Sequence, residues 1–91
     1  MVKKINFDKD SNILKALGHP VRLRMVCGLL RGDECNVNKI VEDLNIPQST
    51  VSQHLGILKS RGIIEPRKDG VNTCYRVVDE RVKEIIDILG N

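Results

Sequence analysis

The chain has 91 residues, with 41% hydrophobic and 30% charged side chains and a formal net charge of +3. This composition predicts one small globular domain over residues 1–91 and argues against a disordered chain. Only 2% of the residues are aromatic, which argues against stacking on single-stranded nucleic acid. No apolar run approaches the ~18 residues of a membrane-spanning helix, and no signal peptide is recognisable. We therefore expect a cytoplasmic protein without a membrane partner.

Apolar residues at helical spacing predict three helices in the first half of the chain. The first covers Ser11–Leu17, with Ser11 as the expected cap. The second covers Pro20–Leu30, because proline suits the first turn of a helix. The third covers Val37–Leu44, whose apolar residues stand at relative positions 0, 3, 4 and 7 and so form one buried face.

A fourth helix is predicted within Ile46–Ser60, and its residues Val51, Leu55 and Leu58 form a core stripe. The opposite face carries hydroxyls and amides and no carboxylate, so it can approach a base edge or a phosphate without repulsion. Such a helix, directly after another short one, is typical of the recognition helix of a helix-turn-helix. Its candidate DNA contacts are Gln48, Ser49, Thr50, Ser52, Gln53 and His54.

Two short strands are predicted after this helix, at Ile63–Arg67 and Thr73–Val78. The segment Lys68–Asn72 is the predicted turn between them, because an Asp-Gly pair is a strong hairpin signal. A hairpin that directly follows a recognition helix is the wing of a winged helix, and its basic side chains suit a phosphate or the minor groove. The candidate contacts in and beside the wing are Arg61, Arg67, Lys68 and Asn72.

A last helix is predicted over about residues 79–89, with Asp79 and Glu80 favouring its positive N-terminus. This helix and the first one, at about residues 9–17, both carry a strong apolar stripe. The simplest cover for these stripes is the same pair of helices from a second copy. We therefore expect a mainly α winged helix-turn-helix with a small β-hairpin, in the order α-α-α-α-β-β-α. As a homodimer, it would bind a palindromic double-stranded operator.

Three stretches of the chain resemble the ArsR/SmtB family of winged-helix repressors. Leu14–Arg24 is similar to the family's first-to-second helix signature, and Pro47–Leu55 is similar to its recognition helix. Gly62–Ile64, Arg67–Gly70 and Tyr75 are similar to its wing. The resemblance implies a dimeric repressor that leaves its operator when an inducer binds or a thiol is modified.

The metal sites that the resemblance implies are not found in this sequence. Metal-sensing members carry two cysteines at the start of the third helix, where this chain has Asn36–Asn38, and amides are poor ligands for soft metals. Other members bind zinc through the last helix, where Asp79 matches the first ligand but Arg81 stands at the second. His19 and His54 have no second ligand at a useful spacing. We therefore expect no metal and no cofactor.

A third branch of the family senses persulfides or oxidants through one cysteine in the second helix and one in the last. Cys27 matches the first position, but the last helix has no cysteine, so a disulfide would need Cys35 or Cys74 instead. The alternative explanation of Cys27 is a small buried core residue, that of Cys35 an incidental surface thiol, and that of Cys74 a strand residue without a redox role. Thiol oxidation, a soft ion such as As(III) on a non-standard cysteine set, and no sensing at all stay open as hypotheses.

The leading prediction is a sequence-specific DNA-binding repressor that cysteine oxidation or persulfidation releases from its operator. One alternative is a repressor of the same type with no small-molecule or metal sensing. Another is a winged-helix module that binds protein, because one fold hosts many functions. An enzyme is not expected, since the sequence shows no Ser-His-Asp or Cys-His pairing, no glycine-rich phosphate loop and no metal cluster.

Overall fold

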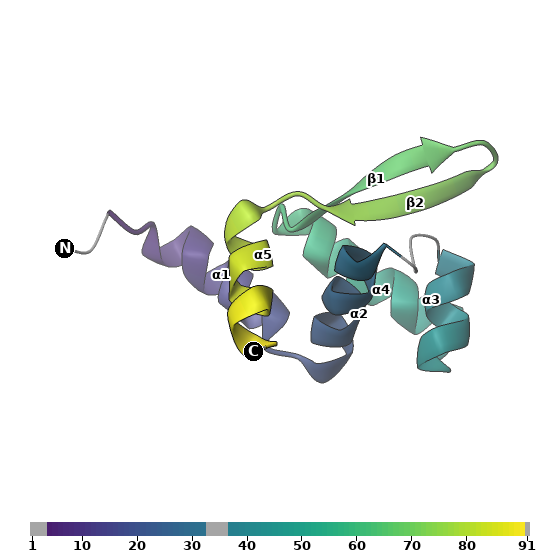
Figure 1. Cartoon of the computed structure of the whole chain (residues 1–91), viewed down its shortest axis with the longest axis horizontal. Helices are drawn as coiled ribbons and strands as arrows, with labels where there is room; N and C mark the ends of the chain where they lie inside the picture. The colour runs from purple at the N-terminus through teal and green to yellow at the C-terminus, as the bar shows by residue number, and fades with distance from the viewer. Residues whose placement is uncertain (1–3, 33–36, 91) are drawn as a thin grey trace.

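The structure is a computed structural model, and it describes residues 4–32 and 37–90. Five helices and a two-stranded antiparallel sheet follow one another in the order α1-α2-α3-α4-β1-β2-α5, which confirms the predicted fold class. Their bounds are α1 Phe7–Leu17, α2 Pro20–Arg31, α3 Val37–Leu44, α4 Gln48–Ser60, β1 Ile64–Asp69, β2 Asn72–Val77 and α5 Glu80–Leu89. The hairpin projects from the helical body, with α1 and α5 toward one end and α3 toward the other (Figure 1).

The hydrophobic core takes residues from every helix and from both strands, and no polar side chain is fully buried among the described residues. From α4 it takes the predicted stripe of Val51, Leu55 and Leu58, each at most 3% exposed. The other buried residues are Ile13, Ala16, Leu17, Met25, Val26, Leu29, Ile40, Ile63, Ile64, Val77 and Val82. In the described part of the chain, no helix is long and apolar enough to cross a membrane.

The first helix begins one turn earlier than the sequence predicts. Asn6 is its cap, because the Asn6 side chain accepts a hydrogen bond from the Lys9 amide at 3.0 Å. Asp8 and Asp10 follow in the first turn, where the helix dipole favours negative charge. Ser11 lies inside the helix and its hydroxyl donates to the Asp8 carbonyl, so the prediction of Ser11 as the cap was wrong.

The second and last helices begin where the sequence predicts, within one residue. His19 caps α2, since its Nδ1 accepts from the Val21 amide at 3.1 Å, and Pro20 occupies the first turn. Asp79 caps α5 by accepting from two amides of the first turn, the shorter bond being 2.9 Å to the Arg81 nitrogen. These side chains satisfy amides that no helical carbonyl can reach.

The hairpin is longer and its turn tighter than predicted. Asp69 pairs with Asn72, so only Gly70 and Val71 form the loop, and the predicted five-residue turn at Lys68–Asn72 was wrong. Gly70 has φ +64°, a left-handed conformation that glycine adopts without steric cost and that two-residue hairpins need. Asn72 therefore lies in β2, and the tip of the hairpin consists of Gly70 and Val71.

Candidate nucleic-acid interface

The exposed face of α4 carries the polar residues that the sequence predicted there. Gln48, Ser49, Ser52 and Gln53 are exposed, and Thr50 is half-buried. They lie opposite the buried stripe, so packing of that stripe turns the polar face to solvent. No side chain caps the first turn of α4, which leaves amides at its N-terminus open to a phosphate oxygen. No Asp or Glu occurs anywhere in the helix.

The turn from α3 to α4 sets the direction of this face. Asn45 has φ +54°, the left-handed conformation that asparagine tolerates better than most residues. The Asn45 amide donates to the Val41 carbonyl at 2.9 Å, which closes the last turn of α3. Ile46 is half-buried against the core, and Pro47 then leads into α4. α3 and α4 pack on each other as the two helices of a helix-turn-helix.

A polar junction joins α4 to the first two helices. The Arg22 guanidinium donates to the Ala16 carbonyl at 2.6 Å and lies 3.2 Å from Nδ1 of His54. The His54 ring also packs against the His19 ring, with centroids 4.7 Å apart. His54 thus holds α4 to the start of α2 from the inner side of the recognition helix. This bracing role for Arg22 was missed, because a bond between residues 32 apart leaves no periodic signal in the sequence.

The junction disfavours the charged form of His54. Burial of the ring lowers the pKa of His54 below its ordinary value of 6.5, and the neighbouring His19 and Arg22 lower it further through charge repulsion. His54 is therefore the neutral partner of the Arg22 guanidinium at neutral pH. A neutral Nδ1 can accept a hydrogen bond from the guanidinium, whereas a protonated ring cannot.

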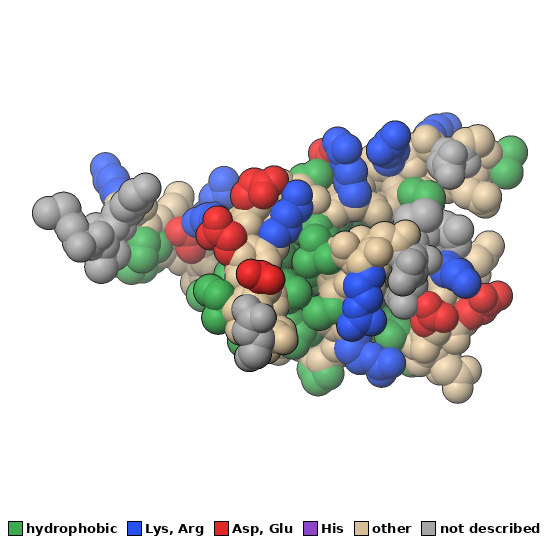
Figure 2. All heavy atoms as spheres, in the orientation of Figure 1, with side chains coloured by type: hydrophobic (Ala, Val, Ile, Leu, Met, Phe, Trp, Pro, Cys, Tyr) green, Lys and Arg blue, Asp and Glu red, His purple; other side chains and the backbone are tan. Residues whose placement is uncertain are grey.

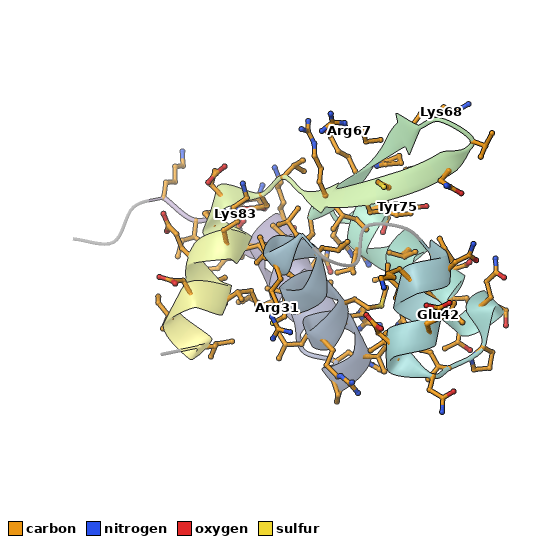
Figure 3. All side chains as sticks on the ribbon, turned by 45° about the vertical axis from the view of Figure 1, so that its right-hand side comes forward. Arg31, Glu42, Arg67, Lys68, Tyr75 and Lys83 are labelled. Carbon is orange, nitrogen blue, oxygen red and sulfur yellow. The ribbon has the colours of Figure 1, made fainter. Side chains whose placement is uncertain are left out.

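The wing presents cations beside α4. Arg67 and Lys68 in β1 and Asn72 in β2 are exposed, and the two cations extend from the hairpin away from the helices (Figure 3). Arg76 bonds to Glu65 across the two strands at 2.9 Å, so its charge is already paired. Sequence reasoning did not foresee this pair, although opposite charges at a cross-strand position stabilise a hairpin.

Arg61 lies apart from the other predicted contacts. It caps the C-terminal end of α4, about 20 Å along the helix from Gln48. It lines a polar cavity with residues of the α1 start, such as Asn6 and Lys9. Arg61 therefore lies at the opposite end of α4 from Gln48, beside the start of α1.

The predicted redox cysteines have different environments. Cys27 on α2 is a half-buried free thiol. Cys74 in β2 is disulfide-bonded, so it does not pair with Cys27. Cys35 lies outside the described residues. Within residues 4–32 and 37–90, no group of three His, Cys, Asp or Glu side chains could hold a metal ion.

A second surface is apolar and belongs to α1 and α5. Phe7 and Leu14, seven residues apart on one face of α1, are 78% and 58% exposed. Ile88 on α5 is 71% exposed and follows Ile85, which lines a groove with Leu14. The predicted stripes are thus only partly buried within one chain, since Leu14 and Leu89 were expected in them and lie at the surface.

An ion pair fixes the two helices of this surface to each other. The Arg81 guanidinium of α5 lies 3.0 Å from the Asp10 carboxylate of α1. The hydrogen bond from Arg81 lowers the pKa of Asp10 below its ordinary value, although an exposed pair of this kind adds little stability. The pair lines the same groove as Leu14 of α1 and Ile85 of α5.

Comparison with known proteins gives matches over most of the chain. A family model described as "Bacterial regulatory protein, arsR family" matches residues 19–65. A helix-turn-helix transcriptional regulator of Methanocaldococcus jannaschii is 43% identical over 83 residues, which are 91% of this chain and 93% of that protein.

Solved structures of transcription regulators share the backbone fold. HlyU of Vibrio cholerae, named a transcriptional activator, has a TM-score of 0.85 and 32% identity, covering 96% of this chain and 94% of its own. The transcriptional repressor PagR of Bacillus anthracis has a TM-score of 0.82 and 34% identity, covering 91% of this chain and 94% of its own. These similarities confirm the predicted winged helix-turn-helix.

The junction predicts a stability that depends on pH through His54. Because its pKa is lowered, the unfolded chain binds a proton at His54 near pH 6.5 and the folded chain does so only at lower pH. The free energy of unfolding is therefore unaffected well above pH 6.5. This free energy falls as the pH drops through 6.5, until the folded His54 is itself protonated.

The measurement is urea unfolding of the wild type and of His54→Gln from about pH 5 to 8. The difference in unfolding free energy between the wild type and His54→Gln should shrink toward low pH. If the unfolding free energies of both proteins change with pH in parallel, His54 does not cause the pH dependence.

Proposed function

The chain belongs to the arsR family of bacterial regulatory proteins, and we propose that it is a homodimeric repressor that binds a specific palindromic operator in the cytoplasm. As a member of this family it is a transcriptional regulator and not an enzyme. Repression is the simpler mode for such a chain, since an occupied operator excludes other proteins by itself. PagR, a relative of similar length, is named a repressor.

The observation that carries the proposal is the polar face of α4 beside the cationic wing. Gln48, Ser49, Ser52 and Gln53 are exposed on a helix without a carboxylate, and Arg67 and Lys68 are exposed on the hairpin, whose first strand packs against that helix. A major groove admits one helix, and amide side chains can make two hydrogen bonds to adenine. A protein-interaction surface would have no reason to combine these features.

Each predicted contact has a proposed task. Gln53 and Ser52 would read base edges from the middle of α4, while Gln48, Ser49 and Thr50 at its start would meet the backbone. The wing would hold phosphates or the minor groove through Arg67, Lys68 and Asn72. Arg61 would contact a more distant phosphate. His54 would act mainly by bracing α4, because its ring is engaged by Arg22 and His19.

The proposed dimer uses the apolar face of α1 and α5. Phe7, Leu14 and Ile88 are all more than half exposed there, which is unusual for large apolar side chains that gather on one face. A second copy would bury them in a two-fold interface. The two recognition helices would then be related by the same axis, and their half-sites would lie one helical turn apart or a multiple of it.

We propose that oxidation of Cys74 controls the wing. Cys74 pairs with Arg67 across the hairpin, and it lines a cavity with Leu29 and Gly32 at the end of α2. Its disulfide state can therefore fix or release the hairpin whose other strand carries Arg67 and Lys68. The sequence contains three cysteines and Cys27 is free, so we propose Cys35 as the partner of Cys74 within the chain.

Substitutions on the two DNA elements should act differently. Gln53→Ala should weaken operator binding by about 1–3 kcal/mol and relax specificity, because a base contact is lost.

Lys68→Ala should weaken binding to all DNA sequences alike. It should also reduce the slope of log K against log salt concentration by about 0.9. Fluorescence anisotropy on operator and random DNA measures both, with Lys83→Ala on α5 as the control for charge. Equal losses on both DNAs for Gln53→Ala would remove its base-reading role. Weak binding that is indifferent to sequence in the wild type would favour the protein-interaction module.

A charge on the apolar face should split the dimer. We expect Ile88→Glu to shift sedimentation from a dimer to a monomer, because two like carboxylates would be desolvated at a two-fold interface. Val71→Glu is the matched control, since Val71 is fully exposed but lies at the wing tip. A wild type that sediments as a monomer, or a dimer that survives Ile88→Glu unchanged, would contradict the proposed interface.

Thiol oxidation should change operator affinity through Cys74. We expect oxidised and reduced wild type to differ at least tenfold in anisotropy titrations, about 1.4 kcal/mol of coupling. Cys74→Ser should abolish the difference and Cys27→Ser should keep it. Peptide mapping under non-reducing conditions identifies the partner of Cys74. If the difference persists in Cys74→Ser, the switch acts elsewhere. If the wild type shows none, the regulator has no thiol sensor.

A further inference from the structure

A pocket of about 430 Å³ opens between α2 and α5, on the face away from the wing tip. Its walls are Leu23 and Leu30 of α2 and Ile86 and Leu89 of α5, with the Cys27 thiol and the Arg31 guanidinium as the polar groups. Figure 2 shows hydrophobic side chains gathered in the hollow between these two helices. Sites for small molecules are typically about 300–1,000 Å³ and combine apolar walls with few polar groups.

Arg31 gives the pocket a charge that the described part of the chain does not neutralise. It is exposed at the end of α2, and none of the ion pairs between described residues includes it. It lies between α2 and α5 (Figure 3). Arg24, two turns earlier on the same face of α2, lines only the neighbouring cavity, to which Arg31 and the single carboxylate residue Asp43 also belong, so the two arginines leave a net positive charge there. The electrostatics of this pocket therefore favour an anion.

From this arrangement we propose that the α2–α5 pocket binds a small amphipathic monoanion, a medium-chain carboxylate. Its hydrocarbon chain lies against the four aliphatic side chains, and its carboxylate accepts two hydrogen bonds from Arg31. The planar guanidinium fork matches a carboxylate in this way. A neutral apolar molecule, or an apolar patch of a second copy, would leave the Arg31 guanidinium without a partner of opposite charge.

The pocket lies between the two functional halves of the molecule. α2 packs against α4 and β2, and Leu89 of α5 borders the apolar face assigned to the dimer. A ligand here contacts one helix of the DNA-binding half and one of the dimerisation half. Binding at the pocket is nonetheless independent of the proposed function, since its test contains no DNA.

Cys27 provides a built-in reporter for the test. In a Cys35→Ser, Cys74→Ser background it is the one remaining thiol, and its alkylation by N-ethylmaleimide is followed with increasing decanoate below its micellar concentration. We expect decanoate to slow alkylation at least tenfold at saturation. Decanol, without the charge, and butyrate, with too short a chain, should protect at least tenfold less well.

Two arginine variants separate the pocket from general attraction of anions. Arg31→Gln should raise the decanoate concentration for half-protection at least tenfold, and Arg24→Gln should leave it within twofold. Absence of protection, equal protection by decanol, or equal effects of the two variants would overturn the proposal. If Cys27 becomes protected as the protein concentration rises, with no decanoate present, a second copy of the chain covers the pocket and the proposal is overturned. If Arg31→Gln fails to fold by circular dichroism, the comparison of decanoate with decanol on the unaltered pocket still decides.

Discussion

Burial of one side of α4 is the constraint on which the other features depend. Val51, Leu55 and Leu58 are buried against α2, α3 and the start of the hairpin. Burial of this stripe determines how α4 is rotated about its own axis. Each such side chain stabilises the fold by about 1.5–3 kcal/mol when removed from water. The polar face of α4 is therefore exposed because the opposite face is required in the core, and the DNA-binding surface inherits its rigidity from that packing.

The polar junction around Arg22 complements this apolar packing. Dispersion and hydrophobic burial determine how closely α4 packs on the core, but these interactions are weakly directional. Arg22 adds direction, because it reaches a carbonyl at the end of α1 and the ring of His54 on α4 at once. The last turn of α1, the start of α2 and the recognition helix are thereby held in one arrangement.

The molecule keeps its three surfaces apart. Exposed amides and cations occur on α4 and the wing, exposed aliphatic and aromatic groups occur on α1 and α5, and the pocket with Arg31 lies between α2 and α5. Such a separation lets DNA, a second copy and a small anion occupy the protein together. α2 packs against the wing, the recognition helix and α1, so it contacts elements that carry the first two surfaces and forms one wall of the third.

The sequence by itself determined the secondary structure and the composition of each face. The spacing in Val37–Leu44 predicted α3 to the residue, and the acid-free face of α4 predicted which side chains are exposed, because both depend only on local periodicity. Asp-Gly predicted the hairpin but not its two-residue loop, since strand pairing beyond the turn decides the register. Only the tertiary structure decided the contact of Arg22 with His54, the position of Arg61 beside the start of α1, and the exposure of Leu14. These depend on how distant elements pack, and such contacts leave no pattern between neighbours in the chain.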